Sequence, residues 1–168
     1  MDYLPCSLQG TSCRLNFQPF LPPINRLHKF LRCSRADRLL LLEALLWLGW
    51  AKLLLLTVPF RWIAPRLGRQ MTESPDSLTE AERPLIRRVG WAVQAIARYL
   101  PLGFVCLPQA MAAKWMLRRR RMPSTLYLGL RREEKANLTA HAWLRVGDKI
   151  ITGRTAIMDH RVIATFGE

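Results

Sequence analysis

The hydrophobic period of this chain changes once, near Pro123, and that change limits the folds open to it. Before Pro123, apolar residues recur at three- and four-residue steps, which is typical of helices that bury one face. After Pro123 the period falls to two, as in strands of a sheet. Helices followed by an antiparallel sheet are the element order of an α+β fold, and 168 residues is the usual size of one domain.

The helical half is predicted to contain three helices. Residues 39–60 are almost continuously apolar, with Glu43 and Lys52 as the charged interruptions. Amphipathic helices are predicted over 82–100 and 107–121. A capping box fits the entrance of the former, because Ser77 and Thr79 are each followed by Glu three residues later. The latter ends in Arg118 to Arg121, which we interpret as a solvated cap favoured by the helix dipole, or alternatively as a docking patch for an acidic partner.

Strands are predicted over 125–130, 139–146, 149–152 and 161–166, with Gly147-Asp148 as a turn. The chain is thus expected to consist of an irregular or disordered tail (1–25), a basic segment with the apolar helix (26–67), a polar linker (68–79) and a core (80–168).

The apolar helix over 39–60 is compatible with three placements. It can be buried against the core or a partner, lie at a membrane interface with Trp47, Trp50 and Trp62 at the headgroups, or span the bilayer. Glu43 and Lys52 would each cost roughly 2.5–3.5 kcal/mol at the centre of a span. Burial is therefore favoured, and peripheral membrane contact is the next interpretation.

Charge and cysteine usage narrow the function classes. A formal net charge of +14 predicts weak, salt-sensitive association with polyanions. The strands carry no interleaved stacking aromatics, so no specific nucleic-acid partner is expected. The first 25 residues lack the pattern of a signal peptide, and no cysteine pair has zinc-ligand spacing with histidines. We expect a cytoplasmic protein without metal or cofactor, with peripheral contact at the inner face of the membrane as the alternative.

Cys106 and His141 are the candidate catalytic residues. Cys106 lies where the chain enters the 107–121 helix, and helix N-terminal N–H groups and the helix dipole favour a thiolate there. The same N–H groups can hold a tetrahedral oxyanion. His141 lies on a predicted strand, from which its imidazole can exchange a proton with the thiol if that strand packs across the helix start.

The order of a cysteine helix followed by a histidine strand is that of the papain and transglutaminase group. The chain further resembles the lasso-peptide leader peptidases, which are stand-alone transglutaminase-like cysteine proteases, over about residues 30–166. The residues that carry this resemblance are Arg35-Ala36-Asp37-Arg38-Leu39, Cys106-Leu107-Pro108-Gln109-Ala110, Leu117 to Pro123, Leu126-Tyr127-Leu128-Gly129-Leu130 and His141-Ala142-Trp143-Leu144.

The resemblance implies a cysteine peptidase that removes the leader from a ribosomally made precursor peptide. It also implies two partners, a small leader-recognition protein and an ATP-using cyclase of the asparagine-synthetase type. The expected fold is a cysteine helix packed on a small antiparallel sheet. Trp143 and Leu128 are expected to line the substrate cleft.

The sequence departs from that family at the third catalytic position. The family has an acid about twelve residues after the histidine, and this chain has Gly153 there. Asp159 and Asp148 are the acidic candidates for orienting His141, and a backbone carbonyl or Thr152 are the other options. The departure leaves a second hypothesis, in which the chain is a catalytically impaired scaffold of the maturation complex.

Overall fold

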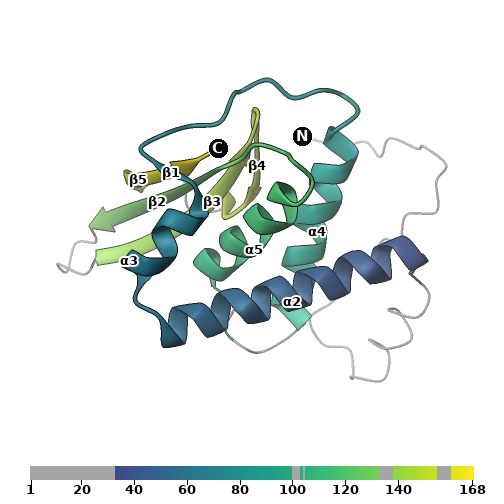
Figure 1. Ribbon diagram of the computed structural model, residues 1–168, viewed down its shortest axis with the longest axis horizontal. Helices are drawn as coiled ribbons and strands as arrows, with labels where there is room; N and C mark the ends of the chain where they lie inside the picture. The colour runs from purple at the N-terminus through teal and green to yellow at the C-terminus, as the bar shows by residue number, and fades with distance from the viewer. Residues whose placement is uncertain (1–32, 100–102, 104, 133–137, 155–159) are drawn as a thin grey trace, which may run out of the picture. The chain divides into compact units, whose positions relative to one another are not determined.

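The computed structural model describes residues 33–99, 103, 105–132, 138–154 and 160–168 (Figure 1). The described helices are α2 (Arg35–Thr57), α3 (Phe60–Ile63), the short 3-10 helix η1 (Ala64–Leu67), α4 (Arg83–Tyr99) and α5 (Cys106–Arg118). The strands are β1 (Arg69–Gln70), β2 (Thr125–Arg132), β3 (Leu138–Val146), β4 (Lys149–Thr152) and β5 (Arg161–Gly167). The α+β prediction is confirmed. The predicted tail, 1–25, lies outside the described residues.

The strands form one antiparallel sheet in the order β1-β5-β2-β3-β4. All four predicted strands are present within two residues of their expected bounds. The sequence did not indicate β1, because two residues are too few to show a period; it pairs with the end of β5 through Arg69 opposite Gly167. This pairing makes β1 one edge of the sheet and β4 the other.

The two faces of the sheet have different chemistry. Alternation along the strands puts five buried apolar residues on one face, namely Leu126, Ala142, Leu144, Val146 and Phe166. Helix α5 packs against β2, β3 and β4, and α4 packs against α5 and β4. The opposite face carries Tyr127, Gly129, His141, Trp143 and Arg145. His141 and the aromatic rings of Tyr127 and Trp143 are therefore on the more polar face.

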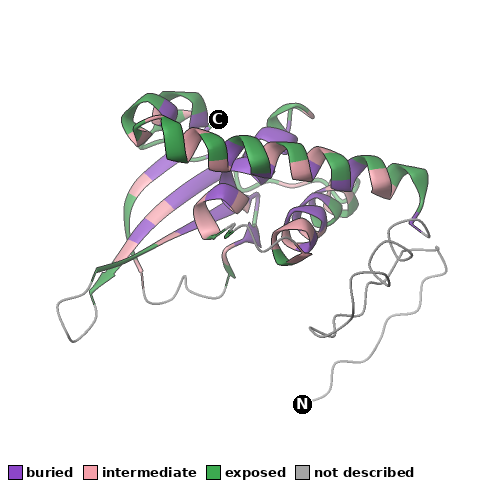
Figure 2. Ribbon diagram, turned by 90° about the horizontal axis from the view of Figure 1, so that it is seen from below, coloured by how far each residue is buried: buried purple, intermediate pink, exposed green. Residues whose placement is uncertain are grey.

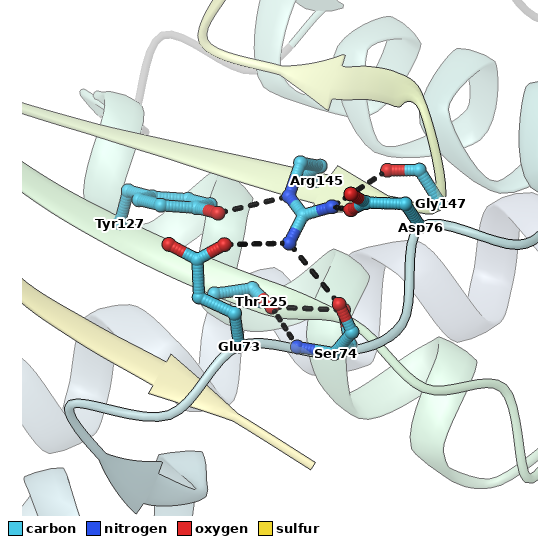
Figure 3. A network of polar contacts seen from close by, with 7 residues as sticks. All are labelled: Glu73, Ser74, Asp76, Thr125, Tyr127, Arg145 and Gly147. Atoms are coloured by element: carbon cyan, nitrogen blue, oxygen red, sulfur yellow. Dashed lines mark hydrogen bonds and ion pairs between the residues drawn. The ribbon is translucent and has the colours of Figure 1, made fainter.

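The predicted linker contains a segment that is fastened to this polar face (Figure 3). The Arg145 guanidinium donates to the Tyr127 hydroxyl at 2.8 Å, to Glu73 at 2.9 Å and to the Ser74 carbonyl at 3.1 Å, and it also pairs with Asp76. The Ser74 amide in turn donates to Thr125 Oγ1 at 2.7 Å. Because Arg145 is half-buried, these bonds satisfy a cation that would otherwise be costly to place there. Residues 73–76 thus cover the sheet and do not form a free linker.

The helix boundaries follow from the predicted caps and charges. Thr79 donates to Glu82 from its amide (3.0 Å) and its hydroxyl (2.7 Å), which is the capping-box pair before α4. Just after the C-terminal end of α5, Arg120 makes a forked ion pair with Glu43 of α2, with N–O distances of 3.0 and 2.6 Å. This ion pair explains how a carboxylate is tolerated in the apolar helix, and it gives Arg120 a partner inside the chain.

The chain divides into two units between Leu39 and Leu40, and residues 40–57 of α2 belong to the second unit. One face of this part is buried through Leu41, Ala44, Leu48 and Ala51, and Trp47 meets Trp115 of α5 with ring centroids 5.3 Å apart. Among the described residues, α2 is the one helix long and apolar enough to cross a membrane by length and composition. Burial of one face agrees with the favoured placement, but the other face is exposed (Figure 2).

Lys114 of α5 is an ionisable residue inside the core. Its side chain is 1% exposed, and Nζ donates to the Ser124 carbonyl at 2.6 Å and lies 3.8 Å from a Glu168 carboxylate oxygen. Burial lowers the pKa of Lys114 from 10.5 to about 8, against the opposing effect of Glu168. The α5 helix is thereby tied to the start of β2 and the end of β5 by one polar cluster.

We predict that Lys114 makes stability rise with pH above about 8. Between pH 8 and 10.5 the unfolded chain holds the Lys114 proton and the folded protein has released it. Because the unfolded state then binds more protons, the free energy of unfolding increases with pH in this window. Relative to Lys114→Met, the wild type should gain on the order of 1–3 kcal/mol by denaturant unfolding. Lys149→Met, at an exposed lysine, is the control. If the unfolding free energies of the wild type and Lys114→Met ran parallel as a function of pH, the lowered pKa of Lys114 would be contradicted.

We also predict opposite effects of alanine at two glycines. A Cβ at Gly129 would lie 2.8 Å from the Trp143 ring and 2.9 Å from the His160 Cβ, whereas a Cβ at Gly49 of α2 meets nothing within 4 Å. Gly129→Ala should lower the unfolding free energy by roughly 1–3 kcal/mol through overpacking. Gly49→Ala should raise it by up to about 1 kcal/mol through helix propensity. Urea unfolding measures both, and equal changes in the two variants would refute the packing described around Gly129.

Candidate active site

Cys106 is the first residue of α5, and its side chain is partly exposed. The residue before it, Val105, is the N-cap and supplies no side-chain hydrogen bond. The first N–H groups of a helix have no partner within it, and Pro108 has none to offer. The N–H groups of Cys106 and Leu107 are therefore the donors at this helix end that a bound oxyanion would meet.

His141 lies on β3 opposite Gly129 of β2. Its Nε2 is 2.8 Å from the Gly153 carbonyl oxygen. A carbonyl can only accept, so Nε2 carries the proton in this bond, and neutral His141 has its free lone pair on Nδ1. The contact arises at the end of β4, where the last β3–β4 pair is Leu144 with Thr152 and the chain turns at Gly153. His141 thus has a fixed tautomer with a basic nitrogen available.

Helix α5 packs against β3, but on the apolar face that carries Ala142 and Leu144, whereas His141 is on the opposite face of the strand. Within the described residues no hydrogen bond joins Cys106 to His141. Catalytic contacts often tighten only when substrate binds, so this geometry does not decide the role of either residue. The Cys106–His141 pair stays a prediction.

The structure shows why no side chain occupies position 153, where the resemblance leads us to expect an acid. Gly153 has φ +75°, and a Cβ there would lie 2.3 Å from the Ala142 carbonyl oxygen and 2.9 Å from Trp143 Cα. The backbone conformation and the space therefore both require glycine. The Gly153 carbonyl makes the orienting contact instead, which is one of the options that the sequence left open.

The other candidates for orienting His141 are placed differently. Asp148 sits in the turn between β3 and β4, and its carboxylate pairs with Lys149 at 3.1 Å and with Arg83 at 3.8 Å. The hydrogen bond from Lys149 is the main cause that lowers the pKa of Asp148. Thr152 is buried, and its Oγ1 has no hydrogen-bond partner within the described part of the chain. Asp159 lies outside the described residues.

Trp143 and Leu128 do not form a common cleft wall. Trp143 is 4% exposed and stacks on Tyr127, with centroids 5.5 Å apart and the rings nearly parallel. Leu128 pairs with Ala142, so its side chain is on the opposite face of the sheet from Trp143. The expectation that both line one cleft is therefore wrong, and Trp143 is a core aromatic that packs over Gly129.

Sequence reasoning missed the neighbour of His141 across the sheet. His160 precedes β5, and its ring centroid is 5.3 Å from that of His141. Only the strand order, which returns β5 beside β2, could have indicated the contact with His141.

The described residues contain no group of three His, Cys, Asp or Glu side chains that could hold a metal ion. Sequence comparison gives one family. The profile of the transglutaminase-like superfamily matches residues 54–165, which include Cys106 and His141. This superfamily includes cysteine peptidases. No curated protein and no solved structure gives a significant match to the chain.

We predict that the acid missing at position 153 cannot be restored by substitution. Gly153→Asp and Gly153→Ala should both lower the unfolding free energy by roughly 1–3 kcal/mol or more, because each adds a Cβ at a left-handed backbone position against the Ala142 carbonyl. Thermal unfolding measures the loss. Arg154→Ala, at the exposed next residue, is the control and should change little. A Gly153→Asp variant as stable as the wild type would contradict this geometry.

Proposed function

The chain belongs to the transglutaminase-like superfamily, and from this premise we propose that it is a cysteine peptidase that removes the leader of a lasso-peptide precursor. The observation that most supports catalysis is the contact between His141 Nε2 and the Gly153 carbonyl, 2.8 Å long. That bond leaves the basic Nδ1 of His141 free, on a strand whose other face packs against the Cys106 helix. The lasso-peptide specificity rests on the motif resemblance alone.

In the proposed reaction His141 Nδ1 takes the proton of the Cys106 thiol. The sulfur then bonds to the carbonyl carbon of the scissile amide, whose oxygen becomes an oxyanion facing the N–H groups of Cys106 and Leu107. Collapse breaks the C–N bond, and His141 returns the proton to the leaving amine. Water then attacks the thioester while His141 takes its proton, and the C–S bond breaks to release the acid and the thiol.

The substrate is expected to lie along the edge of β3 near His141. Strand β4 ends at Thr152, so the part of β3 before Leu144 has no β4 partner. An extended peptide can bind such an edge through main-chain hydrogen bonds, which are independent of its sequence. A separate recognition protein would then be needed to select the leader, and a cyclase of the asparagine-synthetase type would act on the released core peptide.

A second candidate is a scaffold of the same fold without catalysis. Two observations favour it: the orienting group is a neutral carbonyl, and no hydrogen bond joins Cys106 to His141 within the described residues. In this function the protein would hold the precursor and the cyclase without cutting the peptide. The two candidates differ in the fate of the peptide and in the reactivity of the Cys106 thiol.

We predict that the wild-type chain, mixed with the precursor peptide encoded beside its gene and the cognate recognition protein, cuts once at the leader–core junction. Cys106→Ala should abolish the cut, because it removes the nucleophile, and mass spectrometry of the peptide measures it. His141→Gln should reduce the rate by a factor of about 10² or more, through loss of the general base. Cys33→Ala is the matched control, since Cys33 is buried.

The outcome also separates the two candidates. If the peptide binds to the folded wild type and stays intact, and an electrophile labels Cys106 no faster than an ordinary thiol, the scaffold function replaces the peptidase. Cleavage that persists in Cys106→Ala would reject Cys106 as the nucleophile.

A further inference from the structure

The exposed side of α2 is an apolar surface, which we call the leucine face. It consists of Leu42, Leu46, Trp50, Leu53 and Leu56, whose exposed fractions run from 47% to 73%. At 3.6 residues per turn these positions fall within an arc of about 120°, opposite the buried face of the helix. They extend over about 21 Å of helix, at 1.5 Å per residue. Large apolar side chains gathered in this way mark an interaction surface.

The buried face shows that α2 does not span a bilayer in this fold. Ala44, Leu48 and Ala51 have no exposed surface, and Glu43 on the flank is held by Arg120. A spanning position would remove these residues from the core and would break a partly buried ion pair. The helix can therefore meet a surface only with its outer side, and it would lie parallel to that surface.

Cationic and aromatic side chains surround one end of the leucine face. An apolar groove of about 920 Å³ adjoins Trp50 and is also lined by Trp62, Arg66, Arg118 and Arg119. Trp62 is 59% exposed, and the Arg61 guanidinium lies 6.0 Å from the centre of its ring. Tryptophan and arginine in this arrangement suit the headgroup level of a membrane, where one part of each side chain is apolar and the other is polar.

Apart from the Trp50 indole N–H, the side chains of the leucine face carry no hydrogen-bonding group that a protein partner could use. Protein interfaces carry about one hydrogen bond per 100–200 Å². Within residues 42–57, all of which the structure describes, Thr57 lies beside the face, and its hydroxyl donates to the Leu53 carbonyl at 2.8 Å. Its bond is thus made inside the helix. A surface that is aliphatic apart from one indole ring, on a chain of net charge +14, matches an anionic lipid layer better than a folded protein.

We propose that the leucine face of α2 docks the protein on an anionic membrane surface, with Trp50 and Trp62 at the headgroups and Arg61 and Arg66 on the lipid phosphates. This inference does not rest on the peptidase function. The sequence allowed this helix to lie at a membrane interface, and the structure identifies the side that would face the membrane. The opposite face of the same helix stays in the core.

The test is flotation of the full chain with vesicles of phosphatidylcholine alone or mixed with phosphatidylglycerol. We expect the wild type to float with the mixed vesicles and much less with the neutral ones. The double variant Leu46→Glu/Leu53→Glu should reduce the bound fraction at least tenfold. Leu138→Glu/Ile163→Glu adds the same charge at exposed residues of β3 and β5 and should bind like the wild type. Circular dichroism of each variant checks that it is folded.

Two further readouts decide what covers the face. Brominated lipid should quench tryptophan fluorescence in the wild type, and Trp50→Phe/Trp62→Phe should lose most of that quenching. Equal loss of flotation in the two double variants would show that charge alone drives binding and would overturn the proposal. Failure to float, or a wild-type oligomer in solution that Leu46→Glu/Leu53→Glu dissociates, would overturn it in favour of a protein occupant.

Discussion

The fold depends on the burial of the apolar face of the sheet by the helices. Helix α5 lies against β2, β3 and β4, and its small residues Ala110, Ala112 and Ala113 are fully buried. Alanine side chains let a helix approach its neighbours closely, so the buried apolar area is large for a short helix. The start of α5 and the middle of β3 are both fixed by this packing. The positions of Cys106 and His141 therefore depend on it.

Position 153 shows how the same packing limits the chemistry. Because the chain turns tightly after β4, Gly153 takes a left-handed conformation and its carbonyl is presented to His141. An acidic side chain could not occupy that place without moving the Ala142 carbonyl. The absence of the acid is thus a property of the turn, and the group that contacts His141 is a backbone carbonyl.

Much of the fold was predictable, and the reasons are local. The four long strands and the α4 and α5 helices were indicated by period, and the Thr79–Glu82 cap by spacing. The role of residues 73–76 was not predictable, because their contacts are to Arg145 and Thr125, which are distant in sequence. Strand alternation could have separated Leu128 from Trp143 if the pairing of Gly129 with His141 had been known. Leu128 is one residue from Gly129 and so lies on the other face, whereas Trp143 is two residues from His141 and lies on the same face as His141. The Gly153 carbonyl was recognised only as one option, since a backbone group leaves no mark in a sequence.

The contact between His141 and Gly153 bears on how far activity would fall without an acid. In the serine proteases, exchange of the triad aspartate for asparagine costs about 10⁴-fold because the amide can stabilise the wrong histidine tautomer. A carbonyl cannot do this, since it only accepts, and it therefore selects the tautomer with the proton on Nε2. What the carbonyl lacks is the full negative charge that would stabilise an imidazolium. A cysteine nucleophile needs that charge less than a serine does, because a thiol gives up its proton far more readily. The missing acid is thus a weaker argument against catalysis in this fold than it would be in a serine enzyme.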